Sequence, residues 1–176
     1  MRKIILYIAC SLDGKIAKKD GSVGWLESIP TPEEGDYGYA NFYNSIDTTI
    51  QGYKTYDQIM KWGIDFPYAD KKNYVVTRKQ GLKSTEYVDF ISSNHMDFIK
   101  QLKQEKGKDI WLVGGAQLNT ILLEAKLIDE IQLFIMPILL TEGIDMFAAS
   151  AGDWPLQLIR SKVHSNGVVE LNYKPV

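Results

Sequence analysis

One nonapeptide in the second half of the chain indicates the fold class: Ile110-Trp111-Leu112-Val113-Gly114-Gly115-Ala116-Gln117-Leu118. Apolar residues typical of a buried strand run directly into two glycines, and a helical pattern of apolar residues begins at Ala116. Glycines between a strand and a helix bring bare backbone close to a flat or anionic ligand, and the free amides of the helix start suit a pyrophosphate. Tight helix–strand packing explains one glycine but less readily two. The pattern therefore predicts a strand–helix unit with a ligand site at its turn.

Strand and helix patterns alternate along the rest of the chain. β-Branched and aromatic segments predict eight strands, at residues 3–10, 47–51, 72–77, 86–91, 110–113, 130–138, 156–164 and 167–174. Apolar spacing predicts helices at residues 32–43, 54–61, 96–105 and 116–125. Such alternation implies right-handed crossovers and a largely parallel α/β sheet with helices on both faces. The turn Ser165-Asn166-Gly167 predicts that the last two strands form an antiparallel hairpin.

Composition limits the class of protein. The 176 residues contain no repeat, linker or low-complexity tract, so we expect a single domain, 1–176. A formal net charge of −2 gives no overall positive field for nonspecific nucleic-acid binding. The single cysteine, Cys10, and two histidines supply no zinc-type ligand set, so we expect no metal. No apolar run approaches the roughly 20 residues that cross a bilayer, and we expect a cytoplasmic protein without a membrane partner.

Three further loops follow predicted strands, at the position where open α/β sheets bind ligands. They are residues 11–17, 52–56 and 77–79. For the loop at 11–17, the alternative to a ligand site is a plain connection, in which Gly14 supplies a permissive backbone and Asp13 makes a local hydrogen bond in a turn. In the third, Thr77, Arg78 and Lys79 suit a phosphate monoester such as the 2′-phosphate of NADPH, with exposed charge as the alternative.

The loop at 52–56 combines a glycine with a predicted helix start. Gly52 lets the backbone approach a ligand, and a helix that begins near Lys54 directs free amides and its positive dipole end toward an anion. Tyr53 before Lys54 excludes a Walker loop. The alternative is an ordinary helix start capped by Thr55.

Other familiar chemistries lack their motifs. The six-residue dinucleotide fingerprint, the paired-histidine metalloprotease helix, the nucleophile elbow and the calcium loop are all missing from the sequence. We interpret His95 and His164 as surface or cap residues.

Taken in order, the four loops resemble the dihydrofolate-reductase-like superfamily, and most closely the branch of the RibD C-terminal domain, the reductase part of a bifunctional riboflavin-biosynthesis protein. Ser-Leu-Asp-Gly-Lys-Ile-Ala at 11–17 is similar to that branch's first loop, and Gly-Tyr-Lys-Thr at 52–55 to its Gly-Arg-Lys-Thr segment. Val-Val-Thr-Arg at 75–78 is similar to its strand-end phosphate site. Val-Gly-Gly-Ala at 113–116 resembles its double-glycine turn, whose inner peptide is usually cis. The resemblance covers nearly the whole chain.

The resemblance implies a dihydrofolate-reductase-like fold with a mixed eight-stranded sheet and NADPH across the strand ends. It places Ala9 and Ile16 near the nicotinamide. It places Lys54 and Thr55, after Gly52, near phosphates. It places the adenosine 2′-phosphate at Thr77 and Arg78, and the pyrophosphate at Gly114, Gly115, Ala116, Gln117 and Leu118. Because Tyr53 stands where the branch often has arginine, Arg78 and Lys79 carry more of the charge.

The implied function is an NADPH-dependent oxidoreductase that reduces a small heterocycle, of the 5-amino-6-(5-phosphoribosylamino)uracil reductase type in riboflavin biosynthesis. Dihydrofolate reduction and a non-catalytic nucleotide-binding paralogue are the alternatives. Asp36 on the first helix is the best candidate for a catalytic acid, with Glu33 and Glu34 behind it. Alternatively, these three carboxylates only stabilise the positive end of that helix. We also expect a homodimer, with apolar area supplied by the strand from Ile131 to Leu140 and the loop that follows it.

Overall fold

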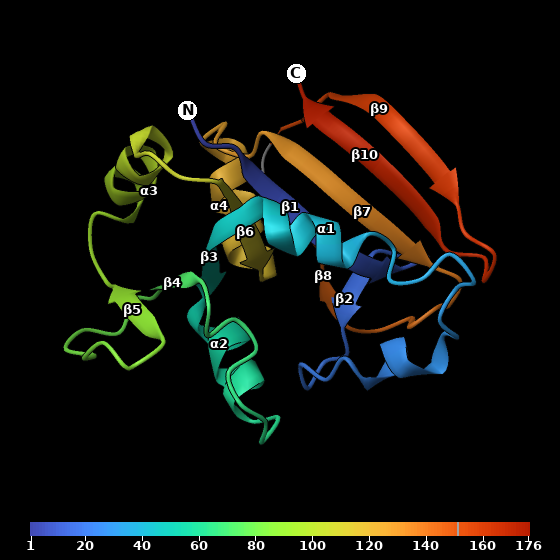
Figure 1. Ribbon diagram of the computed structural model, residues 1–176, viewed down its shortest axis with the longest axis horizontal. Coiled ribbons are helices and arrows are strands. Elements are labelled where there is room, and N and C mark those ends of the chain that lie inside the picture. The colour runs from blue at the N-terminus through green and yellow to red at the C-terminus, as the bar shows by residue number, and fades with distance from the viewer. Residues whose placement is uncertain (151) are drawn as a thin grey trace.

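A computed structural model describes every residue except 151, and its main sheet has eight strands in the order β5-β4-β3-β6-β1-β7-β10-β9 (Figure 1). These strands are β1 (Ile4–Ser11), β3 (Ile46–Gly52), β4 (Lys72–Val76), β5 (Val88–Ile91), β6 (Asp109–Gly114), β7 (Glu130–Met136), β9 (Leu156–Val163) and β10 (Val169–Pro175). Neighbouring strands from β5 to β7 are parallel, whereas β10 runs antiparallel to both β7 and β9. The predicted mostly parallel α/β sheet with a C-terminal hairpin is confirmed.

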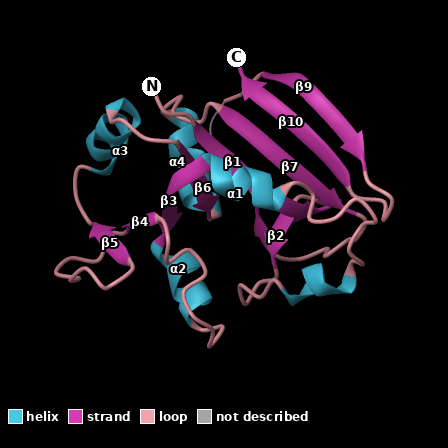
Figure 2. Ribbon diagram, in the orientation of Figure 1, coloured by secondary structure: helices cyan, strands magenta, loops and turns pink. Residues whose placement is uncertain are grey.

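Helices cover both faces of the sheet (Figure 2). They are α1 (Tyr39–Ser45), α2 (Tyr53–Met60), α3 (His95–Gln104), α4 (Ala116–Glu124) and a 3₁₀ helix, η1 (Gly24–Ser28). Alternate side chains of each strand point to opposite faces. Ile4 and Leu6 therefore pack with α3 and α4, whereas Ile5 packs with α1 and α2.

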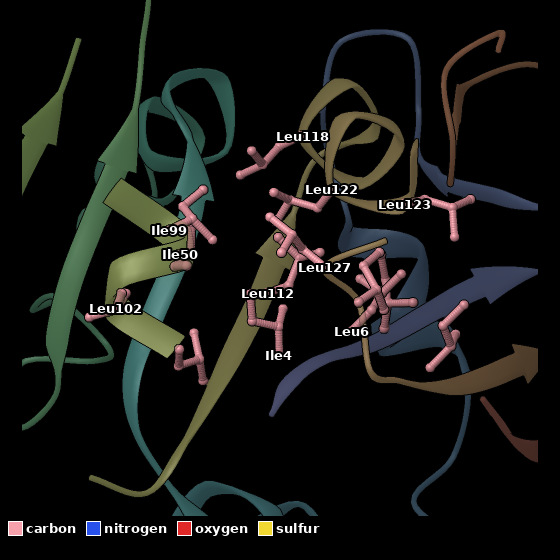
Figure 3. Close-up of a cluster of buried hydrophobic side chains, with 14 residues drawn as sticks. Ile4, Leu6, Ile50, Ile99, Leu102, Leu112, Leu118, Leu122, Leu123 and Leu127 are labelled. Atoms are coloured by element: carbon pink, nitrogen blue, oxygen red, sulfur yellow. The ribbon is translucent and has the colours of Figure 1, made fainter. Parts of the chain in front are cut away.

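The core on the α3 and α4 side positions the start of α4. Leu118 and Leu122 of α4 pack with Leu6 of β1 and Leu112 of β6 (Figure 3). Leu6, Leu112 and Leu122 are fully buried. Burying such a side chain contributes about 1.5–3 kcal/mol, so this contact fixes α4 against the strand that precedes it.

The prediction of a first helix at residues 32–43 is wrong over the first half of that range. Residues 32–38 form turns and bends, and α1 begins only at Tyr39. Gly35, Tyr37 and Gly38 all have positive φ angles, of 102°, 58° and 79°. An α-helix of L-residues requires negative φ, so this backbone cannot continue a helix.

A small second sheet pairs β2 (Lys15–Ala17) with β8 (Ile144–Asp145), antiparallel. Neither strand was expected, because two or three residues are too few to show a strand pattern. The pairing joins the loop after β1 to the loop after β7. Met146 donates its backbone N–H to the carbonyl of Gly14 over 3.1 Å, which extends this contact.

The edge strand β9, and not β7, carries exposed apolar side chains. Every residue of β9 is exposed, including Leu158, Ile159 and Val163. In contrast, β7 lies between β1 and β10, with Ile131 and Phe134 buried. Within the range expected to supply dimer surface, the strand β7 is thus enclosed by two neighbouring strands, whereas Leu139 after it is 61% exposed, and the homodimer stays a prediction.

Among the described residues, no helix has the length and apolar character that crossing a membrane requires.

Gly143 generates a prediction about the contact between the two loops. A methyl group at this position would overlap the carbonyl oxygen of Ala17 and lie 3.3 Å from Cβ of Lys15. Gly143→Ala should lower the free energy of unfolding by roughly 1–3 kcal/mol in urea titration, because the packed backbone must shift. Gly24→Ala is the control, since its methyl group meets no heavy atom within 4 Å. Equal stability of the two variants would contradict this packing.

Candidate functional site

The four candidate loops lie side by side at one edge of the sheet. Parallel strands β4, β3, β6 and β1 are consecutive neighbours, so their carboxyl ends share that edge (Figure 1). The loops at 77–79, 52–55, 114–118 and 11–17 follow them in the same order. Arg78 Nη2 donates to Oε1 of Gln117 over 3.1 Å, which links the first of these loops to the start of α4. Segments far apart in sequence thus form one continuous surface.

The turns after β3 and β6 are in backbone contact. A methyl group at Gly52 would lie 3.7 Å from the carbonyl oxygen of Gly114 and 3.8 Å from the nitrogen of Gly115. A methyl group at Gly115 would lie 3.2 Å from Oγ1 of Thr55, and Gly114 has φ of 116°. The peptide between Gly114 and Gly115 is cis, as predicted. These glycines allow an approach that larger residues would obstruct.

Two helices therefore begin beside each other with free backbone amides. The N-caps of α2 and α4 are Gly52 and Gly115, and neither helix has a side-chain cap. The alternative in which Thr55 caps its own helix is thus wrong. Uncapped N–H groups and the positive ends of two helix dipoles suit a phosphate or pyrophosphate group. Ala116, Gln117 and Leu118 form the first turn of α4, at this point.

Positive side chains surround these helix starts. Lys54, Arg78 and Lys79 are exposed, and Nζ of Lys79 lies 3.9 Å from the centre of the Tyr53 ring. Tyr53 therefore holds a second cation in place through a cation–π contact. Thr77 is buried, and its Oγ1 accepts a 3.0 Å hydrogen bond from the backbone N–H of Lys79. This edge of β4 presents two exposed cations, Arg78 and Lys79, next to the helix amides.

His95 and His164 differ in their surroundings. His95 is the first residue of α3, and its Nε2 lies 2.9 Å from the carbonyl oxygen of Thr77. His164 is only 3% exposed, so its interpretation as a surface or cap residue is wrong. Its Nε2 lies 3.2 Å from Oε2 of buried Glu170, which also binds Nη2 of Arg160 over 2.5 Å. The sequence next to His164 is mostly polar, with Lys162, Ser165 and Asn166, so it gives no local signal for the burial of this side chain.

Asp13 connects the loop after β1 to the loop after β7. Its carboxylate accepts hydrogen bonds from Oγ of Ser11 at 2.7 Å and from the backbone N–H groups of Leu140 at 3.0 Å and Thr141 at 2.9 Å. The Ser11 hydroxyl, followed by the amide of Leu140, lowers the pKa of Asp13 below its ordinary value. The local turn bond in the sequence interpretation is present, but contacts made over more than 120 residues accompany it. They fix the loop that joins Ala9 to Ile16.

Tyr7 lies on the face of the sheet that α1 covers, two residues before Ala9. Its ring stacks on Phe42 of α1 at 4.2 Å and approaches Phe134 of β7 at 4.7 Å. Burial, with smaller effects of Glu170 and Asp36, raises the pKa of the Tyr7 hydroxyl. The phenol is therefore neutral at physiological pH and available as a hydrogen-bond donor. Sequence reasoning missed Tyr7, although the alternation of β1 puts it on the same face as Ala9.

Asp36 lies just before α1, and not on it. Its Oδ1 accepts from the backbone N–H of Gly38 at 3.0 Å and its Oδ2 from that of Ala40 at 2.8 Å. These are the contacts of a carboxylate at the positive end of a helix. Glu34 instead accepts from Oγ of Ser165 at 2.8 Å, in the β9–β10 turn. All three acids, including Glu33, are exposed.

Metal-binding side chains do not gather in the part of the chain that the structure describes, where no group of three His, Cys, Asp or Glu residues could hold an ion.

Comparison with known proteins defines the family. The RibD C-terminal domain family matches residues 67–169. The chain belongs to this family. It is 41% identical over 172 residues to the uncharacterized protein YwjB of Bacillus subtilis (strain 168). That alignment covers 98% of this chain and 97% of YwjB. It is 35% identical to the uncharacterized protein YyaP of the same organism, over 98% of this chain and 94% of YyaP.

A solved structure supports the same conclusion. The chain superimposes with a TM-score of 0.87 and 28% identity on a putative riboflavin biosynthesis protein from Shewanella sp. PV-4. The match covers 100% of this chain and 99% of that one. The resemblance to the RibD C-terminal branch and its fold is thereby confirmed.

The hydrogen bonds of Asp13 generate a prediction about pH. Because its folded-state pKa is lowered, the ionised carboxylate stabilises the fold above the ordinary aspartate pKa of about 3.9, and this contribution disappears as the pH falls through the folded-state pKa. Asp13→Asn should therefore have a lower urea midpoint than the unmodified protein at pH 7, and the difference should shrink as the pH falls below the ordinary aspartate pKa. Asp65→Asn, at an exposed position, is the control. A difference that is independent of pH would show that the charge of Asp13 is not involved.

Proposed function

We propose that this protein is an NADPH-dependent reductase of a small heterocyclic compound. The observation that carries the proposal is the meeting of two uncapped helix starts, α2 and α4, with the cations of the β4 edge. Such a surface suits a ligand with several phosphates. Membership of the RibD C-terminal domain family supports NADPH as that ligand.

The residues at this edge fit the parts of NADPH in order. The pyrophosphate would meet the helix starts at Gly114, Gly115, Ala116, Gln117 and Leu118, and Gly52, Lys54 and Thr55 would lie on its other side. The 2′-phosphate would lie at Thr77 and Arg78. The bare backbone of the glycine turns fits this assignment, because a methyl group at Gly115 would press on Thr55. Ala9 and Ile16 would then line the nicotinamide end.

The cofactor supplies the hydride, and the chain supplies orientation and a proton source. Rigid positioning of Ala9 and Ile16 follows from the contacts that Asp13 makes across the two loops. We propose that Asp36 holds or relays the proton, since it is tied to the start of α1, the helix whose Phe42 stacks on Tyr7. A pyrimidine or pterin ring would occupy the α1 side of the site.

Turnover separates this function from a nucleotide-binding protein without activity. A reductase oxidises NADPH in the presence of a pyrimidine or pterin substrate, whereas a non-catalytic paralogue binds the nucleotide only. The homodimer remains a prediction, and the exposed apolar residues of β9 are the best candidate for its interface. We also propose that the protein is located in the cytoplasm.

Arg78 should select NADPH over NADH. A charge-assisted contact contributes about 1.5–3 kcal/mol, so Arg78→Ala should weaken NADPH binding by roughly one to two orders of magnitude and leave NADH binding unchanged. Fluorescence titration of both nucleotides measures the effect. Lys100→Ala, at an exposed position on α3, is the control. If Arg78→Ala weakened both nucleotides equally, the 2′-phosphate would not be at this position.

Asp36→Asn tests the proton source. With Asp36 as the catalytic acid, turnover should fall on the order of 10²-fold and the pH profile should change, while NADPH affinity stays the same. Glu33→Gln is the control, because it changes a neighbouring exposed carboxylate. If Asp36 only stabilises the start of α1, Asp36→Asn should lower the free energy of unfolding by about 1 kcal/mol or less and leave turnover unchanged.

A further inference from the structure

Among the described residues, the helices lie over the middle of the main sheet and not over its β9 end. Helices α1, α2 and α4 pack mainly on β3, β4 and β6. Figure 2 shows β10 and β9 extending beyond the helices. The last three strands of the sheet, β7, β10 and β9, therefore have a face that is not covered by a helix packed along it.

The strand register shows which side chains share each face of these three strands. Directly opposed residues of neighbouring strands point to the same face. Ile8 of β1 belongs to the core on the α3 and α4 side, and its register partner on β7 is Leu133. We call the continuation of that side over the three strands the outer apolar face, and its main residues are Leu133, Ile135, Leu171, Val169, Leu158 and Val163.

The outer apolar face carries no charged side chain at the strand positions that the structure describes. Its remaining positions are Ile131, Tyr173, Pro175, Leu156 and Ser161. The opposite face of the same strands carries Glu130, Glu170, Lys174, Arg160 and Lys162. That charged face is partly covered, because its Phe134 belongs to one buried cluster with Trp25. The chain thus leaves the uncharged face open, which reverses the usual arrangement for a sheet with one side in water.

Side chains at the β9 end of the outer apolar face are open to solvent. Leu156, Leu158 and Val163 are 42%, 50% and 71% exposed. Leu133 and Leu171, on the next two strands, are only partly buried. Apolar side chains that are exposed next to one another over several strands mark an interaction surface, whereas single exposed ones do not.

The absence of charge on this face favours a second copy of the chain as its partner. At a two-fold interface the same patch meets itself, so charged side chains near the axis oppose side chains of like charge, which is unfavourable. The opposite face of these strands would bring Arg160 and Lys162 against their own copies. The outer apolar face avoids this repulsion, and a sheet face also packs well against another sheet face.

We propose that two copies of this chain form a homodimer through the outer apolar face, with sheet packed against sheet about a two-fold axis. This inference assigns the interface to one face of β7, β10 and β9, and not to the free backbone edge of β9. It goes beyond the proposed function and does not depend on it. The helix starts at Gly52 and Gly115 follow β3 and β6, outside this face.

Sedimentation velocity of the unmodified protein tests the association itself. At micromolar concentrations we expect a species with twice the mass of one chain. The dissociation constant of the dimer should change less than about threefold between low and high salt, because added ions screen charge pairs and this face contains none. A monomer at these concentrations would overturn the proposal, and so would a dimer that high salt dissociates.

Two lysine variants on neighbouring residues of β9 locate the interface. Leu158→Lys puts a charge on the outer apolar face and should raise the dissociation constant at least about a hundredfold, because each dimer loses two buried leucines. Gln157→Lys is the matched control, since this exposed residue is opposed to Lys174 on the other face. Its effect should be about twofold or less. Val163→Lys repeats the test at a second position of the outer apolar face.

Equal effects of Leu158→Lys and Gln157→Lys would overturn the proposal, because pairing through the β9 edge does not distinguish the two faces. A dimer that neither Leu158→Lys nor Val163→Lys weakens would place the interface elsewhere and overturn it as well. The urea midpoints of the three variants, measured alongside, should match, since all three positions are exposed. Failure of the proposed function gives a different pattern, in which the dimer behaves as described but NADPH does not bind.

Discussion

The backbone contact between the turns after β3 and β6 is the constraint on which the candidate site depends. Gly52, Gly114 and Gly115 bring the two turns so close that a methyl group at Gly115 would lie 3.2 Å from Oγ1 of Thr55. Only because the turns touch do α2 and α4 begin side by side, with their free amides facing one surface. The buried contact of Leu118 and Leu122 with the sheet then holds α4 in this position.

A second set of contacts orders the loop between Ala9 and Ile16. The carboxylate of Asp13 joins this loop to residues 140–141, and the absence of a side chain at Gly143 lets β8 pack against the carbonyl of Ala17. Asn119 of α4 adds a hydrogen bond to the carbonyl of Met146 over 2.8 Å. The first loop, the loop after β7 and α4 therefore form one unit, on which precise placement of a ligand ring would depend.

Sequence alone predicts those features that arise from local patterns. The alternation of apolar residues indicates the eight strands, and the family resemblance at Val113-Gly114-Gly115-Ala116 predicts the cis peptide. Other features depend on tertiary contacts and leave no local signal. The burial of His164 depends on Glu170 and Tyr37, a ring at 5.0 Å, and the late start of α1 depends on three residues with positive φ. The hydrogen bonds that Asp13 accepts from Leu140 and Thr141 depend on the loop after β7, which lies more than 120 residues later in the sequence.

Binding of NADPH across the carboxyl ends of β4, β3, β6 and β1 is the central claim. Nuclear magnetic resonance of the ¹⁵N-labelled protein titrated with NADPH tests it directly, because each backbone amide reports its own surroundings. The largest shifts should occur at residues 52–55, 77–79 and 114–118, with smaller shifts at 9–16. Shifts confined to other surfaces, or no shifts at saturating concentrations of the nucleotide, would contradict the account.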